Sequence, residues 1–249
     1  MFTKTRRFAL ATAMLWLVFG AGGRAVADIN ISTPDGLTAG ESFRIVFLTD
    51  GTTTATSSDI NYYNRFVTND ARTEAGGVAL YQGVQLTWTA IASTSAMSAI
   101  SNVGTFGVPV YEVFENVGRL VASTDTTETG GLWSGMLISN ISADLNGNDV
   151  LSTGVWTGTT PDGSQAIGNE LGTSSPRWGD SGDGTSGWVD LGVDLISPMS
   201  PINMYAISQP LTVPSAVTVP EPSTLWMAAG GICAGAAFCW SRRRRQQRR

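Results

Sequence analysis

The sequence predicts a single α+β domain that lies between two targeting segments. The central part of the chain, residues 28–218, contains short apolar segments separated by Gly, Ser, Thr, Asn and Asp, and one early segment has apolar residues at helical spacing. One helix followed by dispersed short strands indicates an α+β architecture rather than a β-sandwich. With 249 residues, 42% of them hydrophobic, the chain is long and apolar enough for one hydrophobic core, or at most two small ones.

The first elements of this domain follow in order. A strand is predicted at residues 43–48, before the turn-prone pair Asp50-Gly51. The clearest helix comes next, with N-caps offered by Ser57 and Ser58 and an end near Arg72. Its apolar face is formed by Ile60, Tyr63, Phe66, Val67 and the pair Asp70-Ala71. A strand at residues 86–91 and a short helix at about residues 95–102 follow.

The second half of the domain is predicted to consist of short strands. Residues 110–114 and 119–122 flank a short turn, and this pattern predicts a β-hairpin. Further strand-like segments lie at residues 155–158, 187–190 and 204–208.

The charge and the composition of the body exclude several functions. Between Asp28 and Val219 the chain holds five arginines, no lysine and nineteen carboxylates, which gives a formal net charge of −14. Such a body repels phosphate backbones, so no nucleic-acid partner is expected. The chain has no histidine, which excludes Ser-His-Asp and Cys-His catalysis and imidazole-bound zinc. Both cysteines, Cys233 and Cys239, lie near the C-terminus, so the body cannot form a disulfide.

Residues 1–27 have the features of a secretory signal peptide. A basic start precedes an apolar stretch at residues 8–19, and the small residues Ala25 and Ala27 predict cleavage before Asp28. An apolar stretch of about 12 residues is too short to span a bilayer. We therefore expect export through the secretory translocon.

The C-terminus, residues 219–249, has three parts in a fixed order. An apolar run, predicted as a transmembrane helix over about residues 223–241, precedes the basic tail 242–249, whose arginines mark the cytoplasmic end. The motif in front of the apolar run is Val219, Pro220, Glu221 and Pro222.

This arrangement closely resembles the PEP-CTERM sorting signal of Gram-negative bacteria. The resemblance implies that an exosortase, a membrane protease-transpeptidase, recognises the motif and processes the protein. The chain would then be a single-pass intermediate in the inner membrane before it reaches the cell surface or the extracellular matrix. A plain single-pass anchor is the alternative interpretation.

The body shows a second resemblance, to the endostatin-type branch of the C-type-lectin-like fold, over residues 43–213. The residues that carry it are Trp133-Ser134-Gly135, the segment 146–151 and the "V-W-x-G" pattern at 155–158 before a Pro- and Gly-containing turn. The resemblance implies a single C-type-lectin-like domain with one or two helices. The chain lacks the cysteines and zinc ligands of endostatin and the sugar-binding motifs of calcium lectins, so binding activity does not carry over.

One loop has the residue types of a calcium site. Asp144, Asn146, Asn148 and Asp149 bring several oxygen-bearing side chains together, and calcium prefers oxygen ligands. The loop lacks the sixth-position Gly and the twelfth-position acid of an EF-hand, and a solvated turn explains the same residues equally well. No other cofactor is expected.

Tryptophans offer a second type of site, because their rings stack on sugars. Trp88, Trp156 and Trp188 lie in strand-like segments with apolar neighbours, where core packing is the commoner role. Trp178 lies in a Gly- and Ser-rich segment and is predicted to be an exposed loop residue.

Two classes of function agree with these observations. The first is a non-catalytic surface or matrix protein, associated with exopolysaccharide or biofilm, which binds a polysaccharide, another matrix protein or itself. The second is a secreted hydrolase that uses carboxylates alone, such as a glycosidase. The absence of histidine and of a recognisable nucleophile motif favours the first class, so no enzymatic activity is expected.

Overall fold

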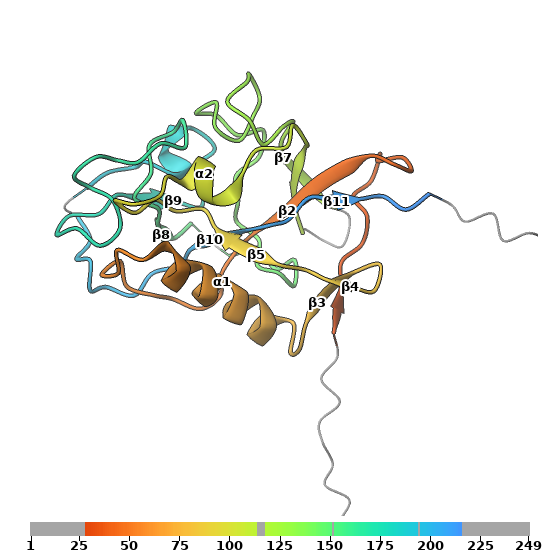
Figure 1. Cartoon of the computed structure of the whole chain (residues 1–249), viewed down its shortest axis with the longest axis horizontal. Helices are drawn as coiled ribbons and strands as arrows, with labels where there is room; N and C mark the ends of the chain where they lie inside the picture. The colour runs from red at the N-terminus through yellow and green to blue at the C-terminus, as the bar shows by residue number, and fades with distance from the viewer. Residues whose placement is uncertain (1–27, 114–117, 151, 194, 216–249) are drawn as a thin grey trace, which may run out of the picture.

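The computed structural model of the chain describes residues 28–215 apart from 114–117, 151 and 194. The strands are β1 (Ile29–Asn30), β2 (Ser42–Leu48), β3 (Ala79–Tyr81), β4 (Val84–Gln85), β5 (Trp88–Ala90), β6 (Val110–Glu112), β7 (Arg119–Ala122), β8 (Gly154–Trp156), β9 (Trp178–Asp180), β10 (Tyr205–Ser208) and β11 (Leu211–Thr212). A six-stranded sheet has the order β5-β10-β2-β6-β7, with β11 also paired to β2. Two smaller sheets, β1-β3-β4 and β8-β9, complete the fold (Figure 1).

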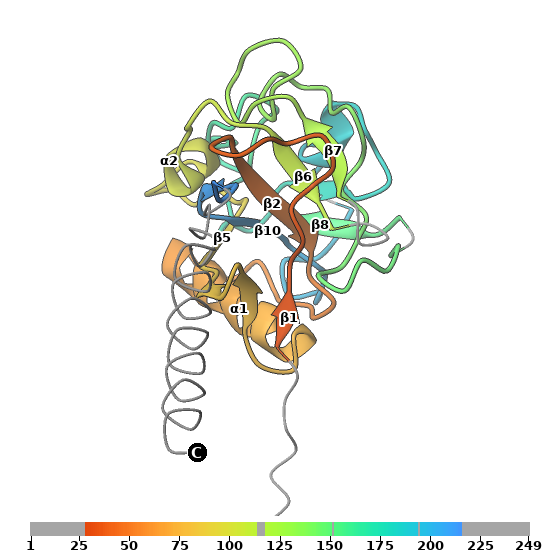
Figure 2. The same cartoon turned by 90° about the vertical axis from the view of Figure 1, so that its right-hand side faces the viewer.

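The two helices lie on opposite faces of the central sheet. Helix α1 (Ile60–Glu74) contributes buried residues to one hydrophobic core, and α2 (Ala99–Val103) contributes Ala99 and Val103 to a second core. Figures 1 and 2 show α1 below strands β5 and β10 and α2 above them. One side of α1 therefore packs on the sheet and the other side faces outward.

Strand β2 connects the two cores because its side chains alternate between the faces of the sheet. Phe43, Ile45 and Phe47 belong to the core to which α1 contributes. Val46 and Leu48 belong to the core to which α2 contributes. A central strand that is covered on both faces reads as a nearly continuous apolar run, which is the pattern at residues 43–48. This strand pairs antiparallel with β10 and parallel with β6.

The N-cap of helix α1 lies one residue after Ser58, the second of the two expected N-caps. Asp59 is the N-cap residue, and its carboxylate accepts a hydrogen bond from the backbone amide of Asn61 at 3.0 Å. Ser57 instead uses its carbonyl oxygen to accept the hydroxyl proton of Tyr63 at 2.8 Å. Asp is as good an N-cap as Ser, so this shift does not change the face that the helix buries.

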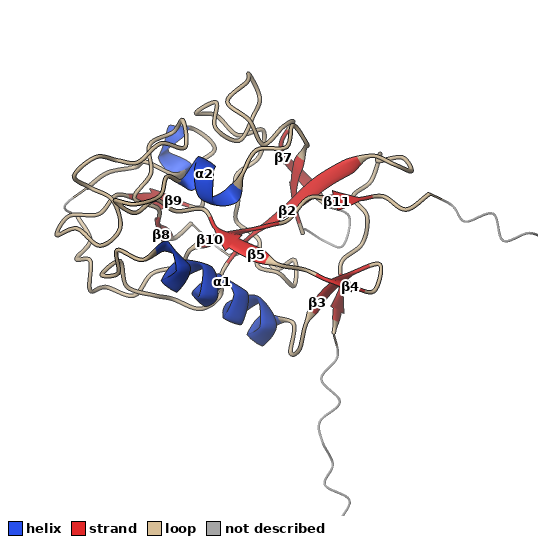
Figure 3. Ribbon diagram, viewed as in Figure 1, coloured by secondary structure: helices blue, strands red, loops and turns tan. Residues whose placement is uncertain are grey.

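The predicted α+β class is confirmed, and most of the predicted elements are present. The first strand, the early helix, the antiparallel pairing of β6 with β7 and the strand near the end of the domain all form. The segments expected at 86–91, 95–102 and 155–158 form shorter elements, namely β5, α2 and β8. Long loops join these short elements (Figure 3).

The strand expected at residues 187–190 is wrong, because this segment begins with a 3-10 helix at Ser186–Trp188. The Thr185 side chain accepts a hydrogen bond from the amide of Gly187 and so caps this turn. Trp188 is completely buried within the turn. The apolar character of Trp188 therefore indicated its burial correctly, but not the secondary structure that buries it.

No helix within the described part of the chain is long and apolar enough to cross a bilayer. The transmembrane helix predicted at residues 223–241 lies outside that part.

Because β2 and β10 contribute to both cores, we expect the body to unfold as one cooperative unit. A truncated chain of residues 28–218 should show a single thermal transition by calorimetry. Its melting temperature should be the same with and without a reducing agent, since this segment contains no cysteine. Two separate transitions would contradict the expectation of a single domain.

Candidate functional site

The loop predicted to bind calcium uses its carboxylates to close its own turn. Asp144 is buried, and its Oδ1 accepts hydrogen bonds from the backbone amides of Asn146 and Asn148, both at 2.8 Å. Its Oδ2 accepts from the side-chain amide of Asn148 at 2.7 Å. Asp149 turns to Ser142, whose hydroxyl donates to it at 2.7 Å. The structure therefore brings Asp144 and Asn148 together and directs Asp149 to another partner, and calcium binding here stays a prediction.

A pair of acidic side chains that the sequence analysis missed lies at the C-terminal end of α1. Asp70 accepts a hydrogen bond from the amide of Gly51 at 2.9 Å. Glu74 accepts from the amides of Asp50 and Leu145, at 3.0 and 2.8 Å. We call Asp70 and Glu74 the acid pair, because the two carboxyl groups are neighbours and Asp70 contributes to the raised pKa of Glu74. The pair ties the helix to two loops that are distant in the sequence.

The surroundings of Glu74 favour its protonated form. Burial, followed by the neighbouring Asp70 carboxyl group, raises the pKa of Glu74 to about 9. The second oxygen of Asp70, Oδ2, is buried and accepts no hydrogen bond in the described part of the chain. A protonated Glu74 can donate to this oxygen.

Substituting Glu74→Gln should change the dependence of stability on pH. The pKa of Glu74 is higher in the folded protein than its ordinary value of 4.5, so the stability that its proton provides is full below pH 4.5 and is lost as pH rises through about 9. Glutamine has no titratable proton in this pH range, so its effect on stability does not change with pH. The melting temperature of Glu74→Gln relative to the unmodified chain should therefore rise between pH 5 and pH 9. A difference that stays constant over this range would show that Glu74 does not hold the proton.

A second buried acid, Glu112, lines a small cavity. It pairs with Arg119 and accepts hydrogen bonds from the amides of Ser142 and Ala143 at 3.1 and 3.0 Å. Burial raises the pKa of Glu112 in spite of these partners. The cavity measures about 220 Å³, and Glu112 is the only carboxylate among the described residues that line it.

The outward side of α1 carries a shallow, open polar depression of about 560 Å³, and all of its lining residues belong to the helix. We call it the α1 groove; it is lined by Asn61, Asn64, Arg65, Thr68, Asn69 and Arg72. Asn64 is held in place because its Oδ1 accepts from the amide of Ala90 at 2.9 Å and its side chain bonds to Asn102. Both arginines are exposed. The groove thus combines a fixed amide with two cationic groups.

The tryptophans divide as predicted except for one. Trp88, Trp156 and Trp188 are buried in the cores. Trp178 is not an exposed loop residue; it begins β9, pairs with Trp156 of β8 and is partly buried against the core. The neighbouring Gly179 allows this packing, because a Cβ atom there would meet the carbonyl oxygen of Trp188 at 2.0 Å.

Comparison with known proteins identifies the C-terminal segment. Residues 218–245 match the PEP-CTERM protein-sorting motif, and this match includes residues 219–222. No curated protein shows significant similarity to the chain. The motif supports exosortase-dependent export to the cell surface or the extracellular space, with an exosortase as the processing partner. The C-type-lectin-like resemblance of the body is not confirmed.

The residues predicted for sorting and for signal cleavage belong to the two ends of the chain. The sorting motif and the pair Ala25 and Ala27 lie outside the described residues. Signal cleavage before Asp28 therefore stays a prediction.

Proposed function

We propose that this is a non-catalytic protein of the cell surface or extracellular matrix whose exported body binds glycan. The PEP-CTERM motif supports the location. The observation that carries the non-catalytic part is that every carboxylate the described structure buries accepts hydrogen bonds from backbone amides. These carboxylates are Asp70, Glu112, Asp125, Asp144 and Glu170. Their role is to organise loops, whereas a catalytic acid or base must reach a substrate.

A carboxylate-dependent hydrolase is the second candidate, and Glu112 is the residue that favours it. Its pKa is raised and it lines a cavity, as a general acid should. However, glycosidases use two carboxyl groups that flank the scissile bond with several ångströms between them. The described lining of this cavity offers one carboxyl group. The carboxyl groups of the acid pair are neighbours that accept backbone amides, an arrangement that does not suit them to flank a glycosidic bond.

The two candidates make different predictions for the same preparation. We would test the full chain, purified in detergent, on a glycan array and on a panel of chromogenic glycosides. Binding without turnover is the expected result. Turnover that the substitution Glu112→Gln abolishes, with the melting temperature retained, would replace the proposal by the hydrolase.

A further inference from the structure

The five arginines of the body fall into two groups in the described structure, those that form an ion pair and those that do not. Three of the five form ion pairs: Arg44 with Asp125, Arg119 with Glu112, and Arg177 with Asp190. The other two, Arg65 and Arg72, have no ion-pair partner in the described part of the chain. Both lie in the α1 groove.

The spacing of these two arginines places them on one face of the helix. They are seven residues apart, which is two turns, or about 10.5 Å along the axis. Polar side chains of Asn61, Thr68 and Asn69 lie beside and between them in the same groove. Guanidinium groups bind carboxylates bidentately, and amide and hydroxyl groups bind hydroxyls.

No carboxylate among the described residues lines the α1 groove, even though the body is acidic. Asp70 points to the core side of the helix, where it is buried. Asp59, the N-cap residue, is exposed, and its carboxylate accepts hydrogen bonds from the backbone amide and the side-chain amide of Asn61 at 3.0 and 3.1 Å, so one carboxylate lies at the N-terminal end of the groove. Arg65 and Arg72 lie further along the helix, so the remainder of the groove is a cationic strip on an anionic protein.

We propose that the α1 groove binds an acidic polysaccharide, with Arg65 and Arg72 each contacting a carboxylate and Asn69 contacting a sugar hydroxyl. This inference rests on the proposed function and names the ligand class and the site. Charge complementarity identifies the ligand as anionic, and the absence of apolar residues from the groove lining disfavours insertion into a membrane surface.

A nucleic-acid strand is disfavoured as the ligand. It carries one phosphate per about 3.4 Å, so about three phosphates would face two arginines and the remainder would meet the acidic body. An acidic polysaccharide carries hydroxyl groups as well as carboxylates on its sugars, and the polar side chains of the groove can bind them. A second copy of this chain is disfavoured because two bodies of formal charge −14 repel each other.

The test measures binding of the full chain in detergent to polygalacturonate, with uncharged dextran as the comparison. We expect Arg65→Gln/Arg72→Gln to weaken polygalacturonate binding about tenfold or more, since two charged contacts are lost. The matched control is Arg248→Gln/Arg249→Gln, which removes the same charge from the C-terminal tail and should keep most of the affinity. Because Arg65 and Arg72 are exposed, the first variant should retain its melting temperature.

Other outcomes would overturn the inference in distinguishable ways. Equal losses in the two variants would show binding through overall charge. Dextran binding that the Arg65→Gln/Arg72→Gln variant retains would leave the proposed function intact and remove the α1 groove as its site. Binding to no glycan at all would reject both the inference and the proposed function. Self-association that the same variant abolishes, seen by sedimentation, would identify a second copy as the ligand.

Discussion

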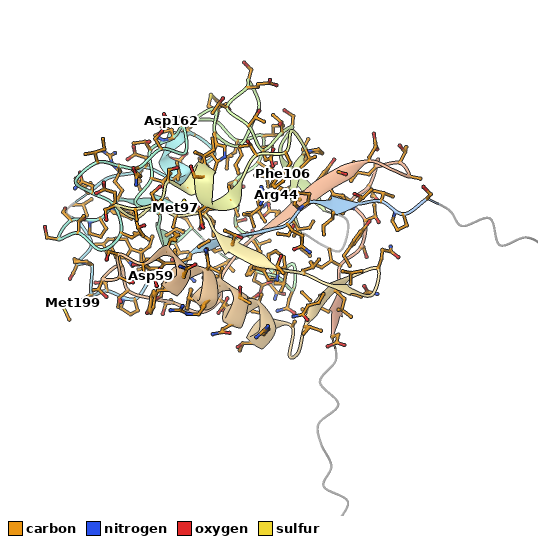
Figure 4. The ribbon with its side chains drawn as sticks, in the orientation of Figure 1. Arg44, Asp59, Met97, Phe106, Asp162 and Met199 are labelled. Carbon is orange, nitrogen blue, oxygen red and sulfur yellow. The ribbon has the colours of Figure 1, made fainter. Side chains whose placement is uncertain are left out.

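Replacing Arg44 by methionine is expected to destabilise the body by about 3–5 kcal/mol, because a buried charge would lose its partner. Arg44 is 1% exposed and lies in the central strand β2. Its guanidinium donates to the carbonyl oxygens of Ser208 and Val103 at 2.8 and 2.9 Å and to the Asp125 carboxylate at 3.1 Å. Figure 4 shows it beside Phe106, whose ring centre is 5.2 Å from the guanidinium carbon.

Urea unfolding measures this effect, and two further variants explain it. Arg65→Met removes an exposed arginine and should change the free energy of unfolding by no more than about 0.5 kcal/mol. Adding Asp125→Asn to Arg44→Met should recover part of the loss, because asparagine still accepts from the Phe106 and Gly107 amides without an unpaired charge. If Arg44→Met is no more harmful than Arg65→Met, Arg44 does not hold β2 to the loops around it.

The sequence predicted those elements in which consecutive residues are apolar and buried. The run at residues 43–48 and the segment 204–208 are apolar enough to identify two central strands. Arg44 within the first run is a signal that the sequence analysis did not use: an unpaired charge in a buried strand costs free energy, so a buried arginine indicates a partner. Its partner Asp125 lies 81 residues away, and no local pattern could identify it.

Strands that depend on tertiary contacts were missed. Strand β9 has the sequence Trp-Gly-Asp and no apolar alternation, so it was interpreted as a loop. It forms because Trp178 pairs with Trp156 across the β8-β9 ladder and Gly179 admits a neighbouring backbone. Burial here depends on the small size of glycine, which hydrophobic periodicity does not detect.

For the candidate sites, the sequence identified the types of residue but not the directions in which their side chains point. Oxygen-rich residues at 144–149 were recognised, but the direction of each side chain depends on the turn that they form. The acid pair had one local signal, two acids four residues apart on a helix, which is unfavourable when both are charged. Its contact with Leu145 depends on packing of a loop 71 residues away.

Deleting residues 220–222 should stop sorting and leave the whole chain in the inner membrane. Proline cannot donate a helical hydrogen bond and disfavours the helical conformation of the residue before it, so the sequence Pro-Glu-Pro predicts an extended segment, as a protease or transpeptidase needs. The apolar run after it contains Gly230, Gly231 and Gly235 and five alanines, which weaken insertion and ease access by a neighbouring enzyme. We therefore expect the segment to serve as a transient anchor while its arginines hold the cytoplasmic end.

Mass spectrometry and membrane fractionation in an exosortase-bearing host test this expectation. The unmodified chain should lose residues 242–249 and reach the surface or matrix, whereas the variant lacking 220–222 should keep them and stay in the membrane fraction. Deletion of Ala216 and Val217, which precede the matched segment 218–245, is the control and should not prevent processing. In a host without exosortase, the unmodified chain and both deletion variants should stay in the membrane fraction with the arginine tail intact. If the unmodified chain and the 220–222 deletion both keep the arginine tail and fractionate alike in the first host, the segment is a permanent anchor.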